Sequence, residues 1–195
     1  LLLRLNGEML DLGEKALPWV GAAVRLDFRD DGSYAIARQQ GKVFCTFPLP
    51  DQSVLLPCHI NGCFDLDPSR RHISTDAELY AEADRVRVAW NRELLKHAAP
   101  QAAAMAIAAL VPDAAANGMS RFFSLWPALD KRTRAPWQGF NESLLRRLSE
   151  RPLIRTRAGS NEQWQTLAET PLPPSLWGED LLEALRDDGL RFPDP

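Results

Sequence analysis

Residues 57–72 concentrate the side chains of this sequence that are best suited to chemistry. The run "PCHINGCFDLDPSRRH" includes two thiols, two imidazoles, two carboxylates and two guanidiniums: Cys58, Cys63, His59, His72, Asp65, Asp67, Arg70 and Arg71. Thiols and imidazoles bind metals or act as nucleophile and base, whereas adjacent guanidiniums bind phosphate or carboxylate groups. The spacing of these residues decides which of the three chemistries is expected.

The cysteines and histidines do not have the spacing of a metal site. Cys58, His59 and Cys63 form a C-H-x3-C pattern without the second pair of ligands that makes a zinc signal strong. In an extended segment, Cys58 and His59 would also point to opposite faces. We therefore predict no metal site and expect Cys45, Cys58 and Cys63 to be small buried hydrophobic residues. A stand-alone small enzyme that uses Cys58 or Cys63 with His59 stays open as an alternative.

Nucleotide-binding motifs are absent from the sequence. It contains no G-x4-G-K-[ST] or G-x-G-x-x-G motif, and its "DLGEK" run lacks the second glycine of a D-x-G-x-G motif. We expect no cofactor in this chain and no catalytic residues of its own. Arg70 and Arg71 are the candidates for sensing a phosphate, because two guanidiniums after the turn at 67–69 can form bidentate hydrogen bonds. The alternative is a salt bridge from one arginine to Asp65 or Asp67.

The first half of the sequence predicts the β-sheet that would position this run. Segments rich in β-branched and aromatic residues predict strands at 22–28, 34–38, 43–49 and 56–62. Turn-forming residues at 30–33 predict a hairpin between the first two strands, and the Asn-Gly pair at 61–62 predicts a turn after the fourth. Pro48, Pro50 and Pro57 have no N–H to donate, so we expect them at sheet edges or in loops.

From residue 74 the sequence changes to a helical period. Apolar residues predict one buried helix face: Val86, Trp90, Leu94, Met105, Ala109 and Leu110. Pro100 predicts a kink or a restart, because it removes one backbone donor. Residues 112–120 predict a break in the chain. A helix at 139–150, short strands around 152–157 and 163–168, and a final helix after 172 complete the series.

Together these elements predict an α+β fold. We expect an N-terminal antiparallel or mixed β-sheet packed by a long kinked helix, followed by a smaller C-terminal α/β portion. The predicted boundary separates residues 1–115 from residues 116–195, unless the two portions form one continuous module.

Composition narrows the classes of partner. The net charge of −3 and the pI of about 5.7 disfavour a nucleic-acid partner, which usually requires a basic stripe. Arg4 and Glu8 interrupt the apolar start well short of a membrane span, so no membrane partner is expected. Three cysteines and no signal peptide predict a cytoplasmic location. We also expect the chain to be a piece of a longer protein.

Several motifs, in this order, resemble the repeating region of sacsin-like proteins. They are a glycine-led strand that ends in "PLP" (41–50), the extended "LPCHINGCFDL" (56–66), the arginine pair and the "WNRELL" helix (90–95). The later "FFSLWP" (122–127), the helix from Trp137 through Leu145 and the strand with "QW" (163–164) also fit. The resemblance extends from about residue 20 to the end of the chain.

The resemblance implies a role next to another domain. In sacsin-like repeats a GHKL ATPase domain, like that of the large heat-shock chaperones, comes first, and this segment resembles the part that comes after that domain. The middle segment of those chaperones donates a basic residue to the γ-phosphate, so by analogy Arg70 or Arg71 would do so here, with ATP and Mg bound only by the adjacent domain. The expected function is a non-catalytic segment that couples this domain to client or partner proteins.

Other observations bear on this expectation. Exposed Trp126, Trp137 or Trp177 would serve such partner contacts, although tryptophans at helical spacing usually belong to the core. A pure scaffold or interaction domain is the second alternative to the coupling role.

Overall fold

The fold is that of a computed structural model, which describes residues 2–5, 8–11, 19–75, 85–117, 121–127, 137–158, 161–170, 183, 187 and 192–193. The chain divides into two compact units, Leu1–Leu144 and Leu145–Pro195. The expected boundary at residue 115 stays a prediction. Trp177 lies outside the described residues, and of the predicted final helix only residues 183 and 187 are described, both as helical.

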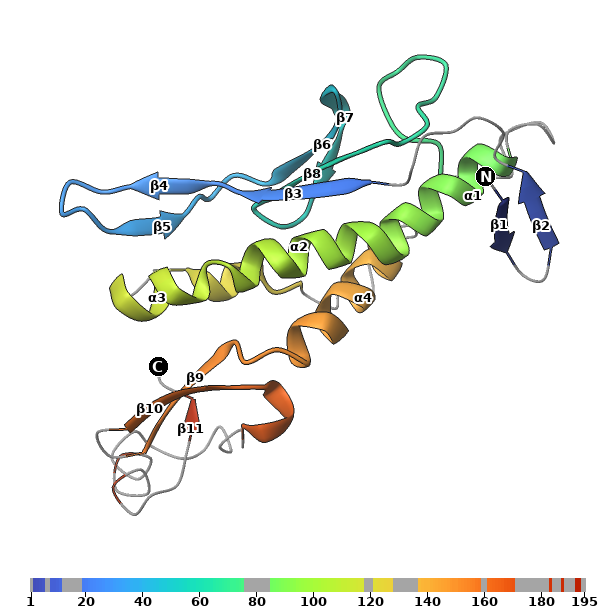
Figure 1. The fold of residues 1–195 in the computed structure, drawn as a ribbon. Coiled ribbons are helices and arrows are strands. Elements are labelled where there is room, and N and C mark those ends of the chain that lie inside the picture. Colours follow the sequence, from blue (N-terminus) through green and yellow to red (C-terminus); the bar gives the residue numbers. More distant parts are fainter. Residues whose placement is uncertain are drawn as a thin grey trace. The chain divides into compact units, whose positions relative to one another are not determined.

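The first unit contains a four-stranded mixed sheet that lies on one side of a long helical run (Figure 1). Its strands, in spatial order, are β3 (Val20–Val24), β8 (Cys58–Gly62), β6 (Gly41–Cys45) and β7 (Phe47–Val54). The β3–β8 and β6–β7 pairs are antiparallel, whereas β6 and β8 run parallel. This confirms the expected mixed sheet.

Two antiparallel pairs accompany this sheet in the first unit. The hairpin of β4 (Leu26–Phe28) and β5 (Tyr34–Ile36) turns at Gly32, whose φ of 81° suits glycine. The other pair is β1 (Leu2–Leu5) with β2 (Glu8–Asp11). The predicted strand at 22–28 is therefore divided at Arg25 between two sheets.

Two details of the sheet correct the sequence prediction. The predicted strand at 43–49 contains a tight reversal at Thr46, whose φ is 70°, so Cys45 pairs with Phe47 across β6 and β7. Residues 61–62 do not form a turn but pair with β3, because Asn61 and Gly62 complete the β8 ladder. The prolines follow expectation.

Both prolines of β7 lie on the edge of the sheet. Pro48 and Pro50 are in β7, which among the described strands has a neighbour on one side only, so their missing N–H groups break no central ladder. Pro57 directly precedes β8, as expected of a residue that ends a loop.

A long bent helical run packs on the sheet (Figure 1). It consists of α1 (Arg85–Glu93), the π-helical η2 (Leu94–Ala98), α2 (Ala99–Ala108) and α3 (Val111–Asn117). The π-helical turn precedes Pro100, where the ordinary i to i−4 hydrogen bond is lost, and this confirms the expected irregularity. The predicted break at 112–120 is wrong for residues 112–117, which belong to α3.

The buried face of α2 lies against β3 and β8. Its core residues are Ala99, Pro100, Ala103, Ala104 and Ile107, and the three alanines among them let the helix come close to β8, whose Cys58 and Ile60 are fully buried. Met105 was expected on this face but is 57% exposed, and Ala109 is exposed as well. Their positions on the helix turn them away from the sheet.

The run Arg85–Ala114 is long and apolar enough to cross a membrane by length and composition. Within the residues that the structure describes it is the single helix of this kind, and a buried core helix passes the same test. Its contacts with β3 and β8 are those of a core helix.

The other described elements complete an α+β fold. The first unit continues with η3 (Phe122–Leu125), and α4 (Trp137–Ser149) extends across the division between the units. The second unit contains a sheet in the order β10 (Asn161–Gln165), β9 (Ile154–Ala158) and β11 (Phe192–Pro193), together with η4 (Leu167–Glu169). The mixed sheet, the bent helix and the smaller C-terminal portion are those expected.

Candidate phosphate-sensing loop

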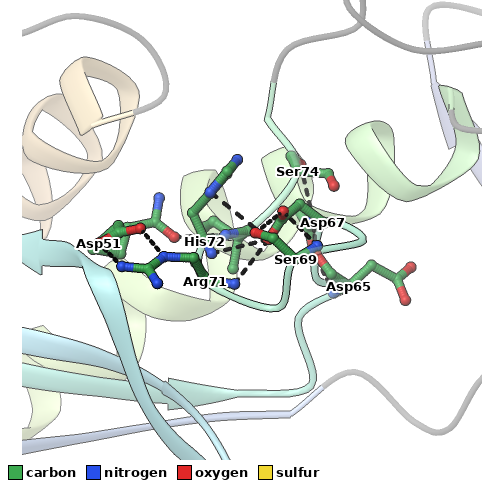
Figure 2. A network of polar contacts seen from close by, with 10 residues as sticks. Asp51, Asp65, Asp67, Ser69, Arg71, His72 and Ser74 are labelled. Carbon is green, nitrogen blue, oxygen red and sulfur yellow. Dashed lines mark hydrogen bonds and ion pairs between the residues drawn. The ribbon is translucent and has the colours of Figure 1, made fainter.

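The side chain of Asp67 organises the loop of residues 65–74, named here the Asp67 loop (Figure 2). Its carboxylate accepts backbone N–H groups from Ser69 at 2.8 Å, from Arg71 at 3.0 Å and from His72 at 3.0 Å. The Ser69 hydroxyl donates to the same carboxylate. Three amides directed at one carboxylate fix the backbone on both sides of the arginine pair.

The Asp67 carboxylate is ionised and buried. The residue is 6% exposed. Burial by itself would raise the pKa of Asp67, but the hydrogen bonds from Ser69, His72 and Arg71 outweigh it and hold the pKa well below its ordinary value. His72 Nδ1 lies 3.7 Å from Asp67 Oδ1, so a protonated His72 would add an ion pair. The loop is therefore organised around one buried negative charge.

Arg71 is tied to the edge strand β7. Its Nε and Nη2 donate to the two carboxylate oxygens of Asp51 at 2.5 and 3.0 Å, which is a bidentate pair. These hydrogen bonds lower the pKa of Asp51 and raise that of Arg71. The expected salt bridge from an arginine to Asp65 or Asp67 is thus replaced by one to Asp51, although the Arg71 backbone N–H does bond Asp67.

Arg70 has a different environment from its neighbour. Its backbone is left-handed, with φ of 57°, and its N–H donates to the Asp67 carbonyl at 2.9 Å. Its side chain is exposed, and within the described part of the chain it forms no hydrogen bond or ion pair. The two phosphate-sensing candidates therefore differ: the guanidinium of Arg71 is engaged and that of Arg70 projects into solvent.

Trp90 and Asn91, in the "WN" motif, form hydrogen bonds with the Asp67 loop and with the residue shortly before it, Cys63. Trp90 Nε1 donates to the Cys63 carbonyl at 2.8 Å. Asn91 is fully buried, accepts the Asp65 N–H at 2.8 Å and donates to the carbonyls of Asp65 and Ser74 at 2.7 and 2.8 Å. Sequence reasoning missed Asn91; the signal was a polar residue beside Trp90 on the buried helix face.

The cysteines and His59 do not form a nucleophile and base pair. Cys58 is fully buried, and burial raises the pKa of its thiol to about 12. His59 lies on the other face of β8 from Cys58, and its Nδ1 accepts the Lys42 N–H at 3.0 Å. The Cys63 thiol contacts the backbone of Trp19, donating to its carbonyl at 3.5 Å. Cys58 is buried as expected, whereas Cys45 and Cys63 are only half-buried.

The described residues contain no group of three or more His, Cys, Asp or Glu side chains that could hold a metal ion. The two tryptophans proposed as contact residues that can be described, Trp126 and Trp137, are half-buried. The Trp126 ring is tilted against Phe123 with 6.4 Å between ring centroids, and the Trp137 ring meets Phe140 edge to face at 5.6 Å. Their rings belong partly to the packing of the chain.

Comparison with known proteins gives one similarity. The chain is similar to human sacsin, with 32% identity over 154 residues, which is 72% of this chain and 3% of the length of sacsin. No protein-family model matches the chain. No solved structure matches it either.

Proposed function

The chain is a sacsin-like region over 72% of its length, and from this premise we propose that it is a chaperone-related, non-catalytic segment that couples a neighbouring ATP-binding domain to partner proteins. The chain spans about 3% of its curated relative, so the rest of such a protein would supply the other domains. ATP and Mg belong to an adjacent GHKL-type domain in this proposal.

The environment of the arginine pair is the observation that carries the proposal. A guanidinium that reaches a phosphate in another domain must be exposed and must not already be held by a carboxylate. Arg70 meets both conditions within the described residues, whereas Arg71 is already held, because Asp51 binds it. We assign the phosphate contact to Arg70 and the fixing of the loop to Arg71.

The Asp67 loop holds the backbone of Arg70 in a fixed position. A phosphate contact from a second domain is productive only if the guanidinium is positioned before the domains meet, because ordering it afterwards costs binding energy. The Ser69 and Arg71 N–H groups donate to the Asp67 carboxylate, and the Asn91 side chain donates to the Ser74 carbonyl. These hydrogen bonds hold the backbone on each side of Arg70. An arginine that arrives from outside the nucleotide site can then stabilise the charge of phosphoryl transfer.

The half-exposed face of the mixed sheet is the surface proposed for partner proteins. A hollow of about 370 Å³ there is lined by Gly21, Ala22, Ala23, Phe44, His59 and Asn61. Its small residues leave the Phe44 ring and the His59 imidazole, 5.5 Å apart between centroids, as its largest side chains. An aromatic wall beside small residues suits an apolar side chain of a polypeptide.

The test is ATP turnover by a longer protein that contains the preceding nucleotide domain. Arg70→Ala should lower turnover at least about tenfold, because a lost charge-assisted hydrogen bond in the transition state costs that much or more. Arg70→Lys should recover part of the loss, since it keeps the charge but not the planar fork. Arg146→Ala, which removes an exposed arginine of α4, is the matched control.

Turnover unchanged by Arg70→Ala would rule out a phosphate contact by Arg70. A large loss with Arg71→Ala and none with Arg70→Ala would show that the roles of the two arginines are reversed.

A further inference from the structure

The β4–β5 hairpin collects charged residues on one face. Asp27 of β4 and the residues that flank this strand, Arg25 and Arg29, all line the same hollow. Across the hairpin, Ala35 pairs with Asp27, and the Ala37 N–H donates to the Arg25 carbonyl at 3.0 Å. Alanines opposite long side chains leave space, and a hollow of about 330 Å³ lies here.

Arg121 closes this hollow from another part of the chain. Its Nη1 donates to the Ile36 carbonyl at 2.8 Å, although 85 positions separate the two residues. The backbone of Arg121 is left-handed, with φ of 67°, a conformation that costs a non-glycine residue about 1 kcal/mol or more. The surrounding structure keeps the residue in this conformation, and the guanidinium is thereby held at the rim of the hollow.

Arginines outnumber the acidic residues around the hollow. Arg25, Arg29, Arg38 and Arg121 line it together with Asp27. The pKa of Asp31 in the hairpin turn is lowered by its hydrogen bonds with Ser33 and also by the guanidinium of Arg29, which lies close to this carboxylate. Arg25 is oriented by its hydrogen bond to Gln39 Oε1 at 2.7 Å, and its Nε lies 3.6 Å from Asp27 Oδ1. The chain as a whole has a net charge of −3, so this concentration of arginine is local.

We propose that this hollow, here named the hairpin hollow, binds the phosphate group of a small phosphorylated ligand. With Asp27 and Asp31 set against the four arginines, two positive charges remain, and a dianionic phosphate balances both, whereas one carboxylate group of a ligand balances only one. Guanidinium forks match phosphate oxygens in bidentate geometry. The volume is at the lower end of small-molecule sites, which limits the ligand to a phosphate with a small organic part.

This site is independent of the proposed coupling role. The hairpin hollow shares no lining residue with the Asp67 loop, and it needs no second domain. Binding can therefore be measured with the 195-residue chain itself.

The experiment is calorimetric titration of the full chain with inorganic pyrophosphate at low ionic strength, with glycerol phosphate and citrate in parallel. We expect saturable binding of one pyrophosphate or glycerol phosphate per chain that weakens as salt is added. Arg38→Ala should weaken binding about tenfold, and Arg29→Ala with Arg38→Ala should abolish it. Arg146→Ala removes one positive charge elsewhere and should leave the affinity unchanged.

Arg38 is chosen because its side chain is exposed, so its loss should not unfold the chain; circular dichroism of each variant checks this. Pyrophosphate binding that survives both arginine substitutions would place the anion elsewhere and overturn the proposal. No saturable binding of either phosphate compound, or citrate binding as tight as that of pyrophosphate, would overturn it too.

Discussion

Replacement of Asn91 by alanine tests whether the Asp67 loop depends on one buried side chain. Asn91 is 0% exposed and makes three hydrogen bonds, to the Asp65 N–H, the Asp65 carbonyl and the Ser74 carbonyl. Alanine would remove all three and leave their partners inside the protein. An isolated helix could tolerate this change, because alanine is the better helix former.

The expected loss of stability follows from these partners. The Asp65 carbonyl keeps a second donor, the Ser74 N–H at 3.3 Å, so this carbonyl loses only one of its two hydrogen bonds. The Asp65 N–H and the Ser74 carbonyl lose their Asn91 partner, and a buried unsatisfied group costs about 1–3 kcal/mol. The two groups together give a loss of about 2–6 kcal/mol, a large share of the about 5–15 kcal/mol that stabilises a typical protein.

Urea denaturation of the chain, followed by tryptophan fluorescence, measures this loss because Trp90 adjoins Asn91. Asn91→Asp should be at least as destabilising at neutral pH, because a carboxylate would face two carbonyl oxygens that now accept N–H donors. Lys96→Ala, an exposed change in the same helical run, should stay within about 0.5 kcal/mol of the wild type. A loss below about 1 kcal/mol for Asn91→Ala would refute the reasoning.

Two further predictions concern a glycine and a carboxylate. Gly41→Ala should destabilise the chain by about 3 kcal/mol or more in urea denaturation, because its Cβ would lie 1.9 Å from the Cys58 carbonyl oxygen. Gly139→Ala, in α4 with nothing within 4 Å of the new Cβ, should stabilise it by about 0.5–1 kcal/mol. Asp67 has a folded-state pKa below its ordinary value of 3.8, so it stabilises the fold above about pH 4 and less as the pH falls below that. In an Asp67→Asn variant the free energy of unfolding should therefore fall less steeply as the pH is lowered, measured by urea denaturation from neutral pH down to about pH 3.

Each of these two predictions has a result that would contradict it. Equal effects of alanine at positions 41 and 139 would show that β6 and β8 can separate without cost. An Asp67→Asn variant with the acid dependence of the wild type would show that other carboxylates govern that limb.

The sequence predicted much of the fold because its signals are local. Alternation of apolar residues predicts strands, a period near four predicts a helix, and Pro100 predicts an irregular turn; these patterns need no knowledge of distant residues. The burial of Cys58 and the edge positions of Pro48 and Pro50 followed in the same way. The reversal at Thr46 was not predicted, because its left-handed backbone is formed by a threonine and not by the glycine that usually marks this conformation.

The candidate site could be predicted only in part. Arg70 and Arg71 are adjacent and chemically identical, so their types and spacing could mark the pair but could not divide the roles within it. Whether a guanidinium is held depends on which carboxylate folds next to it, and Asp51 comes from a strand 20 positions away. Asn91 contacts the loop across 26 positions in the same manner. Local composition determined the elements of this protein, and only the tertiary structure decided their partners, because hydrogen bonds between distant residues depend on how those elements pack.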